Sequence, residues 1–504
     1  MYDVSPTTDA TRTSTRDLWL SLGGILGFQF VAMLRLRNAA FVDEGTYIMA
    51  GRTMLGRITQ GDWSAAPFAT YFSGAPYLQP IWVAWLDQAG GLPLARALST
   101  ACLVLATLAL AWGIGRAQGR AVGVGAALVF AVQGTVQFVG HLATPDAPSL
   151  LLVALALSIA FAASEKGAVA SAIAVGVLAG GAGAIKYGAM AYAPPVALIL
   201  AIRLWERGAR ERAVVAFLLS AVAGASVLWL LLRLDGGALL DAVWFTTVNR
   251  PFSEGKAPLL ITGKLLEYGG LLLLLAIYGL TQRRYSLVLS ATLFFGMLVA
   301  PLQHIRLGET VSLHKHIAFS ALFAAPFAGI AMVRCSQGLR QLVRFRGRDP
   351  RSVMWLLAVG SGLSLMVFPG LAQSGALFDA WPQETPEVYR TVARDLPDGA
   401  RILTEEADLG AYYGTALQPS HWVGPQTPYR AAGGREIPVD SAVVVALQEG
   451  AFDRIVLRFD RSHTWSEMVT SLLQQNPLYV VRATVRYRLP GEDGAFVVWE
   501  RRTP

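Results

Sequence analysis

The chain has 504 residues, of which 54% are hydrophobic and only 15% are charged, and its formal net charge is +8. Soluble domains usually carry about 25% charged residues, so this composition excludes an ordinary soluble protein. Apolar stretches of roughly 18 residues or more recur between Leu18 and Leu371, and each can cross a bilayer as a helix. The sequence therefore predicts a polytopic α-helical membrane protein.

The position of the arginines predicts which loops face the cytoplasm. The predicted spans, in chain order, are 18–36, 94–115, 120–139, 147–163, 167–184, 186–203, 213–234, 258–281, 285–302, 316–334 and 352–372. Most loop arginines then fall in short loops on one side of the membrane, as the positive-inside rule requires. We therefore expect an inner N-terminus and an outer C-terminus, and we ascribe the net positive charge to these loops rather than to nucleic-acid binding.

The segment 76–91 has two readings. Its apolar core covers only about ten residues between Pro80 and Asp87, which is short for a crossing and is typical of a helix lying at the interface. If it crossed instead, every later loop would invert and the arginine-rich loop 334–351 would face outward. We therefore expect about eleven transmembrane helices, with interfacial helices in a first outer loop at 37–93.

Beyond Gln373 the composition is that of a soluble domain. Helices are predicted at 384–396 and 465–475, and strands in "ARILTE", "SAVVVALQ", "RIVLRF", "YVVRATVRYRL" and "AFVVWER". This alternation predicts a small α/β domain. The predicted organisation is a cytoplasmic tail at 1–17, a transmembrane domain at 18–372 and an extracytoplasmic α/β domain at 373–504.

The stretch "FVDEGTYIMAGRTMLG" places Asp43 and Glu44 directly after the first span. On a short helix Asp43 and Tyr47 share a face. A single aspartate here could equally be a solvated loop acid. A second acid, Asp146 in "HLATPDAPSLLL", returns to the same predicted outer side, although it also fits an ordinary helix N-cap. Two carboxylates facing one outer cavity are harder to explain by capping alone.

Basic residues also gather on the predicted outer side. Lys186 in "AGAIKYGAMAYAPP" and Arg96 in "GGLPLARALS" either extend to the headgroups or neutralise a lipid phosphate. Two later loops, "FTTVNRPFSEGKAP" and "QHIRLGETVSLHKHIAF", supply Arg250, Lys256, His304, Arg306, His314, Lys315 and His316. Together with His141, these histidines suggest a zinc site, but their spacing matches no strong ligand pattern. Binding of an anionic ligand is the preferred interpretation.

These motifs, in this order and on one side, resemble the GT-C glycosyltransferases, in particular protein O-mannosyltransferases and lipid A aminoarabinose transferases. The resemblance is best over residues 15–205 and includes "YFSGAPYLQPIWVAW". It implies transfer of a sugar from a polyprenyl-phosphate donor to an acceptor hydroxyl on the extracytoplasmic side. It implies that Asp43 is the general base, that Glu44 and Asp146 complete the acidic set, and that Lys186 lies near the carrier phosphate.

An attacking hydroxyl needs a base, while a lipid phosphate is already a good leaving group, so an inverting single displacement is expected. The predicted cations for the donor phosphate are Lys186, Arg96, Arg250, Lys256, Arg306, His314 and Lys315, and the predicted cavity residues are Tyr47, Tyr71, Tyr187 and His141. The acceptor is left open between a glycan, a lipid and a protein. No cofactor is predicted, and a divalent cation is left open.

Two other functions compete with this one. A lipid or sugar transporter would carry ionisable residues near the bilayer centre and broken helices in paired halves, whereas the ionisable residues here lie at helix ends. A non-catalytic membrane subunit of a polysaccharide-synthesis complex is compatible with the sequence. Replacement of Asp43 separates that subunit from an enzyme.

Overall fold

The structure, a computed structural model, describes residues 15–64, 68, 72–235, 237–247, 257–345, 353–425, 427, 429–431, 436–437, 439–460 and 464–502. The chain forms two compact units. The first unit comprises residues 1–35, 63–75 and 97–374, and the second comprises residues 36–62, 76–96 and 375–504. The domain boundary predicted at 373 stays a prediction.

The first unit is helical. Its helices are α1 (Thr15–Met33), α4 (Arg120–Val132), α5 (Gly134–His141), α6 (Asp146–Ala162), α7 (Ala168–Ile185), the 3-10 helix η2 (Tyr187–Tyr192), α8 (Ala193–Glu206), α9 (Arg210–Asp235), α10 (Ala238–Thr247), α11 (Pro258–Thr281), α12 (Leu287–Leu307) and α13 (Leu313–Phe345). Two further helices, α3 (Gln79–Gln118) and α14 (Val353–Phe378), have residues in both units. The predicted polytopic helical fold is confirmed.

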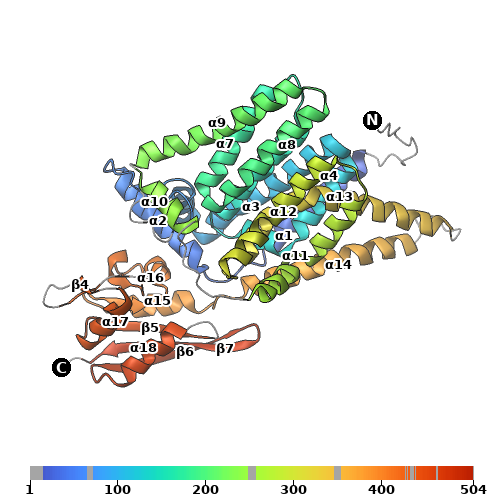
Figure 1. The fold of residues 1–504 in the computed structure, drawn as a ribbon. Helices are drawn as coiled ribbons and strands as arrows, with labels where there is room; N and C mark the ends of the chain where they lie inside the picture. The colour runs from blue at the N-terminus through green and yellow to red at the C-terminus, as the bar shows by residue number, and fades with distance from the viewer. Residues whose placement is uncertain are drawn as a thin grey trace. The chain divides into compact units, whose positions relative to one another are not determined.

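Small residues allow these helices to approach closely. Helices α7, α8 and α9 lie side by side (Figure 1). A Cβ atom on Gly180 of α7 would lie 2.7 Å from the carbonyl oxygen of Gly224 on α9. Such contacts between small residues are typical of helix pairs in membranes, where apolar side chains gain nothing by leaving lipid. Helix α13 packs against α4, α5, α11 and α12 and is largely buried.

Helices occupy all eleven predicted spans, but the number of crossings is not confirmed. Among the described residues, seven helices are long and apolar enough to cross a membrane, or eight if the bent α4–α5 pair is one span. Shorter apolar helices cover Asp146–Ala162 and Ser364–Phe378. The span predicted at 120–139 is bent by 72°. There Gly134 lies against α14, where a Cβ would be 2.8 Å from the Gly370 carbonyl oxygen.

The second unit begins with two helices that precede the C-terminal α/β part of the chain, α2 (Val42–Ile58) and the first part of α3. Helical geometry in α3 is interrupted at Gly90 and Gly91, and Gly91 has φ +71°, a conformation that favours glycine. The interruption lies at the end of the predicted interfacial segment 76–91 and before the predicted span at 94–115, so those two predicted segments are distinct helices.

The rest of the second unit is the predicted α/β domain. Its elements are α15 (Thr385–Ala393), β1 (Ile402–Thr404), α16 (Ala407–Tyr413), η3 (Pro419–His421), β2 (Trp422–Val423), β3 (Tyr429–Arg430), β4 (Glu436–Ile437), α17 (Val439–Gln448), β5 (Arg454–Phe459), α18 (Thr464–Gln474), β6 (Tyr479–Leu489) and β7 (Glu492–Arg501). The main sheet has the order β2-β1-β5-β7-β6, with β1 parallel to β2 and β5, and β7 antiparallel to β5 and β6.

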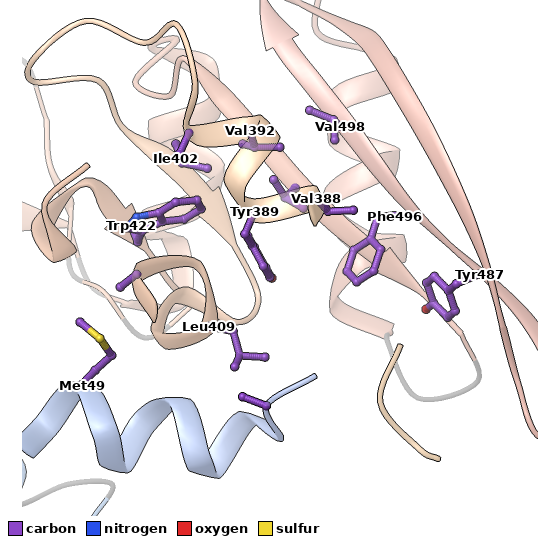
Figure 2. Close-up of a cluster of buried hydrophobic side chains, with 14 of the residues drawn as sticks. Met49, Val388, Tyr389, Val392, Ile402, Leu409, Trp422, Tyr487, Phe496 and Val498 are labelled. Carbon is purple, nitrogen blue, oxygen red and sulfur yellow. The ribbon is translucent and has the colours of Figure 1, made fainter. Parts of the chain in front are cut away.

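Alternating side chains give this sheet two cores. On β5, Val456 joins a cluster formed with α15, α16 and α2, whereas Ile455 and Leu457 join a cluster formed with α17 and α18. Figure 2 shows the first cluster, which includes Tyr389, Leu409 and Trp422 together with Met49 of α2. Successive side chains of a strand point to opposite faces of the sheet, and β5 is buried on both faces from Arg454 to Arg458, which explains this division. The α2 helix thus shares a core with the soluble domain.

One element of this domain was predicted wrongly. "SAVVVALQ" is part of helix α17, not a strand. The three consecutive valines favour a strand by propensity alone. The buried residues, however, are Ala442, Val443, Ala446 and Leu447, which recur with the spacing of a helix face. Burial of that face against the sheet outweighs the preference of the valines.

Candidate active site

Asp43 lies in the first turn of α2, where Phe41 is the N-cap residue. Its side chain is partly exposed, whereas the neighbouring Glu44 is fully buried. The Oε2 atom of Glu44 accepts a hydrogen bond from the backbone N–H of Phe41 at 2.9 Å. An acidic side chain in the first turn of a helix interacts favourably with the helix dipole, so this position suits Asp43.

Glu44 and Arg96 form a buried bidentate ion pair. Arg96 Nε donates to Glu44 Oε1 at 2.8 Å, and Nη2 donates to Oε2 at 2.6 Å. The same guanidinium donates to the carbonyl oxygens of Asn38 and Ala39, both at 3.2 Å. Because a guanidinium has a fixed planar geometry, these bonds fix the backbone just before α2. The pair therefore holds the segment that carries Asp43.

Helix α16 of the soluble domain contacts the same segment. The hydroxyl oxygen of Tyr413 accepts a hydrogen bond from the backbone N–H of Ala40 at 2.5 Å. Thr46 donates to Asp408 Oδ2 at 2.7 Å. Burial raises the pKa of Asp408, an effect that the bond from Thr46 opposes, and burial also raises the pKa of Tyr413. Tyr413 therefore stays a neutral phenol at physiological pH.

A second set of contacts fixes the middle of α2. Arg52 forms an ion pair with Asp87 of α3 at 2.7 Å, and Tyr412 donates a hydrogen bond to the other oxygen of Asp87, also at 2.7 Å. The Arg52 guanidinium lies 5.4 Å from the Tyr412 ring centroid. The predicted cavity residue Tyr47 is buried on α2. Helix α2 therefore contacts α16 near its start and is linked to both α3 and α16 at its middle.

A group of charged residues in the first unit includes Asp146 and Lys186. Asp146 is the first residue of α6, where Pro145 is the N-cap residue. Lys186 Nζ lies 2.7 Å from Asp146 Oδ1, and Thr144 donates to Oδ2 at 3.0 Å. Both charged side chains are buried, at 2% and 7% exposure. Removing either side chain would leave the other as an uncompensated buried charge, which is strongly destabilising.

The position of Lys186 is fixed by a short strap at residues 72–75. Lys186 separates α7 from η2 in an extended conformation. Ala75 N–H donates to the Ala184 carbonyl at 2.8 Å, and Tyr187 N–H donates to the Ser73 carbonyl at 2.7 Å. A Cβ on Gly74 would lie 1.9 Å from the Ile185 oxygen. The strap can therefore reach the chain beside Lys186 only with glycine at position 74.

Gly74→Ala is expected to displace the strap and to destabilise the protein by about 1–3 kcal/mol, the usual cost of overpacking. Gly188→Ala is the matched control, because a Cβ at Gly188 would meet no described heavy atom within 4 Å other than those of its local backbone and chain neighbours. The measurement is the thermal unfolding of both variants in detergent. Equal unfolding temperatures for the two variants would show that the strap is not tightly packed.

The turn between α12 and α13 adds further titratable groups. Gly308, in the left-handed conformation, ends α12. His304 Nδ1 lies 3.1 Å from the backbone oxygen of Glu309, and His304 Nε2 lies 2.8 Å from His316 Nδ1. Lys315 is buried, and it acts electrostatically on Asp146, as Lys186 does more strongly. The turn and the Asp146–Lys186 pair therefore form one group.

The other predicted residues occupy varied places. His141 is buried, with Nδ1 3.1 Å from the Thr100 hydroxyl. His314 packs edge-on against the ring of Phe138. Arg306 is exposed in the last turn of α12, and Tyr187 is buried in η2. Tyr71, Arg250 and Lys256 lie outside the described residues.

Asp43, Glu44, Arg96 and Tyr47 belong to the second unit, whereas Asp146, Lys186 and Lys315 belong to the first. Within the part of the chain that the structure describes, no three His, Cys, Asp or Glu side chains are grouped to hold a metal ion. The sequence did not single out Glu309, which is 1% exposed, or Tyr413. Glu309 follows the helix-ending Gly308, but an acid after a glycine is also typical of an ordinary turn.

Comparison with known proteins identifies the fold. Residues 82–230 match the family model described as dolichyl-phosphate-mannose-protein mannosyltransferase. No curated protein matches the chain. The structure resembles ArnT from Cupriavidus metallidurans in the apo state, with a TM-score of 0.58, 14% identity, and coverage of 96% of this chain and 98% of ArnT. This chain has the GT-C glycosyltransferase fold.

Two further structures share the GT-C fold. ArnT from the same organism bound to undecaprenyl phosphate has a TM-score of 0.57 and 15% identity, with 96% and 98% of the two chains covered. The oligosaccharyltransferase AglB from Archaeoglobus fulgidus, in complex with an inhibitory peptide and a dolichol-phosphate, has a TM-score of 0.58, 12% identity and coverage of 96% and 74%. The resemblance predicted from the sequence is confirmed at the level of the fold, and residues 82–230 match a glycosyltransferase family model.

Proposed function

We propose that this GT-C protein transfers a sugar from a polyprenyl-phosphate donor to an acceptor hydroxyl on the extracytoplasmic side of the membrane. The observation that carries the proposal is the burial of Lys186 and Lys315 together at helix ends of an apolar domain. Lysines are costly inside a membrane domain and usually mark a functional site. The undecaprenyl phosphate in the ArnT complex and the dolichol-phosphate in the AglB complex support a lipid phosphate as the ligand.

The proposed reaction is a single displacement with inversion. The acceptor oxygen attacks the anomeric carbon, its proton passes to Asp43, and the bond between the anomeric carbon and the phosphate oxygen breaks. The carrier phosphate changes from a monoanionic diester to a dianionic monoester. Lys186 and Lys315 stabilise this added charge. Glu44 and Arg96 act as positioning residues for Asp43, because their hydrogen bonds are made with each other and with the backbone before α2.

Two elements of the proposal rest on the sequence. The arginine-rich loops are expected to face the cytoplasm. The extracytoplasmic location follows because the candidate residues lie on the predicted opposite side of the membrane. The acceptor stays open between a glycan, a lipid and a protein, since no described contact favours one of them.

Lys186→Met is expected to weaken the binding of undecaprenyl phosphate by at least about tenfold, since a buried charged contact is worth roughly 2 kcal/mol or more. Because this change alone leaves Asp146 without its ion-pair partner, the double variant Asp146→Asn/Lys186→Met is made beside it. The double variant should recover stability without recovering binding. The measurement is lipid titration by intrinsic fluorescence on protein in nanodiscs. Unchanged affinity in both variants would contradict the proposed phosphate site.

A further inference from the structure

Two histidines form a hydrogen-bonded relay at the turn between α12 and α13. His304, 1% exposed, lies near the end of α12, and His316 lies in the first turns of α13. Their rings are joined through His304 Nε2 and His316 Nδ1 at 2.8 Å. The other nitrogen of His304, Nδ1, faces the Glu309 carbonyl oxygen at 3.1 Å. The relay thus runs from a backbone carbonyl through two imidazoles.

The hydrogen-bond partners fix the protonation of both rings. A carbonyl oxygen can only accept, so His304 Nδ1 must carry a hydrogen and donate it to Glu309. In neutral His304 the Nε2 atom is then an acceptor, so His316 Nδ1 must carry a hydrogen and donate it to His304. In neutral His316 this leaves the lone pair on Nε2. The relay therefore ends in the lone pair of His316 Nε2, which can accept a proton.

The Nε2 atom of His316 is available to a ligand. Within the described ranges it makes no hydrogen bond, and the His316 ring is partly exposed. The charged groups acting on the ring are Lys186 at the end of α7, His304 on α12, Asp146 at the start of α6, and Lys315 beside it on α13. The buried acid Glu309 lies at the same turn. The two lysines disfavour a third positive charge while no anion is bound.

We propose that the His304–His316 relay takes up one proton when a phosphate dianion binds beside Lys186 and Lys315, and that His316 Nε2–H then donates to a phosphate oxygen. This inference rests on the proposed function. Solvent supplies the proton, Nε2 accepts it, and no other bond changes. During transfer the carrier phosphate becomes a dianion while Asp43 holds the acceptor proton, so His316 is a separate proton site that responds to the leaving group.

The test is calorimetric titration of undecaprenyl phosphate into the full-length protein in nanodiscs at about pH 8. At that pH a phosphate monoester, with a second pKa of about 6, is a dianion, and a free histidine, with a pKa of about 6.5, is neutral. Repeating the titration in two buffers of different ionisation enthalpy gives the number of protons taken up. We expect uptake approaching one proton per lipid for the unmodified protein.

His316→Asn keeps a donor toward His304 Nε2 and removes the proton acceptor, so uptake should fall to near zero while the lipid still binds more weakly. His421→Asn is the matched control: His421 Nδ1 bonds the Ala400 carbonyl in the soluble domain, and uptake should be unchanged. If His316→Asn is unstable, His304→Gln replaces it and should lower the midpoint pH of uptake. Lipid binding without proton uptake in the unmodified protein would overturn the relay, whereas absence of lipid binding would overturn the proposed function itself.

Discussion

Replacing Asp43 with Asn is expected to lower kcat by about 10²–10⁴-fold, the usual contribution of a general base. The amide has nearly the same shape as the carboxylate but cannot accept the proton of the acceptor hydroxyl. Because Asp43 is partly exposed in the first turn of α2, the change should leave the fold intact. Binding of undecaprenyl phosphate should also be unchanged, since the proposed phosphate contacts are Lys186 and Lys315.

The matched control for this variant is Asp62→Asn. Asp62 lies just beyond the C-terminal end of α2, where it forms an ion pair with Arg57 and is 45% exposed. The measurement is single-turnover transfer from a polyprenyl-phosphate sugar, with lipid affinity determined in parallel. If the Asp43 variant retains full turnover, Asp43 is not the base and another group accepts the proton. If both variants lose activity together, the loss reflects α2 rather than the carboxylate.

Arg96→Ala is expected to destabilise the protein by about 3–5 kcal/mol, the usual cost of removing one partner of a buried ion pair. Glu44 would keep its charge without its bidentate partner, and the carbonyls of Asn38 and Ala39 would lose their donor. The segment before α2 should then become mobile, so kcat should fall even where the protein still folds. KM for the lipid donor should change less than kcat.

The double variant Glu44→Gln/Arg96→Met distinguishes the effect of the ion pair on stability from its effect on the position of Asp43. It removes both charges, keeps an acceptor for the Phe41 N–H, and should recover most of the lost stability without recovering kcat. Unfolding temperature and kcat are measured on the two single variants and the double variant. Recovery of kcat together with stability would show that the ion pair matters only for folding and has no positioning role for Asp43.

Hydrophobicity made the helical part of this fold predictable. A helix occupies each of the eleven apolar runs, because a bilayer-length apolar segment must satisfy its backbone hydrogen bonds internally. The sequence did not predict the bend at the α4–α5 junction or helix α10. At the bend, Gly134 lies close to α14, a helix far away in the chain. Local pattern carries no signal for such a contact.

The sequence singled out individual candidate residues but not the pairs that they form. Asp43, Glu44, Asp146, Lys186 and Arg96 stood out because charges at the ends of apolar runs are costly. The partnership of Glu44 with Arg96 joins residues 52 positions apart, and no local rule specifies it. The same holds for the histidine relay, where hydrogen bonding depends on how a turn closes after Gly308.

The contact of Tyr413 with Ala40 joins residues 373 positions apart. At roughly 5–20 residues per second, a ribosome needs about 20–75 s to extend the chain over this interval. Until then the nascent chain has its apolar helices but not the α16 contacts that hold the start of α2. A chain terminated before α16 would thus have the Glu44–Arg96 pair but lack the Tyr413 and Asp408 contacts with the segment around Asp43. Synthesis of the last quarter of the protein therefore sets the time at which all contacts that hold this segment can form.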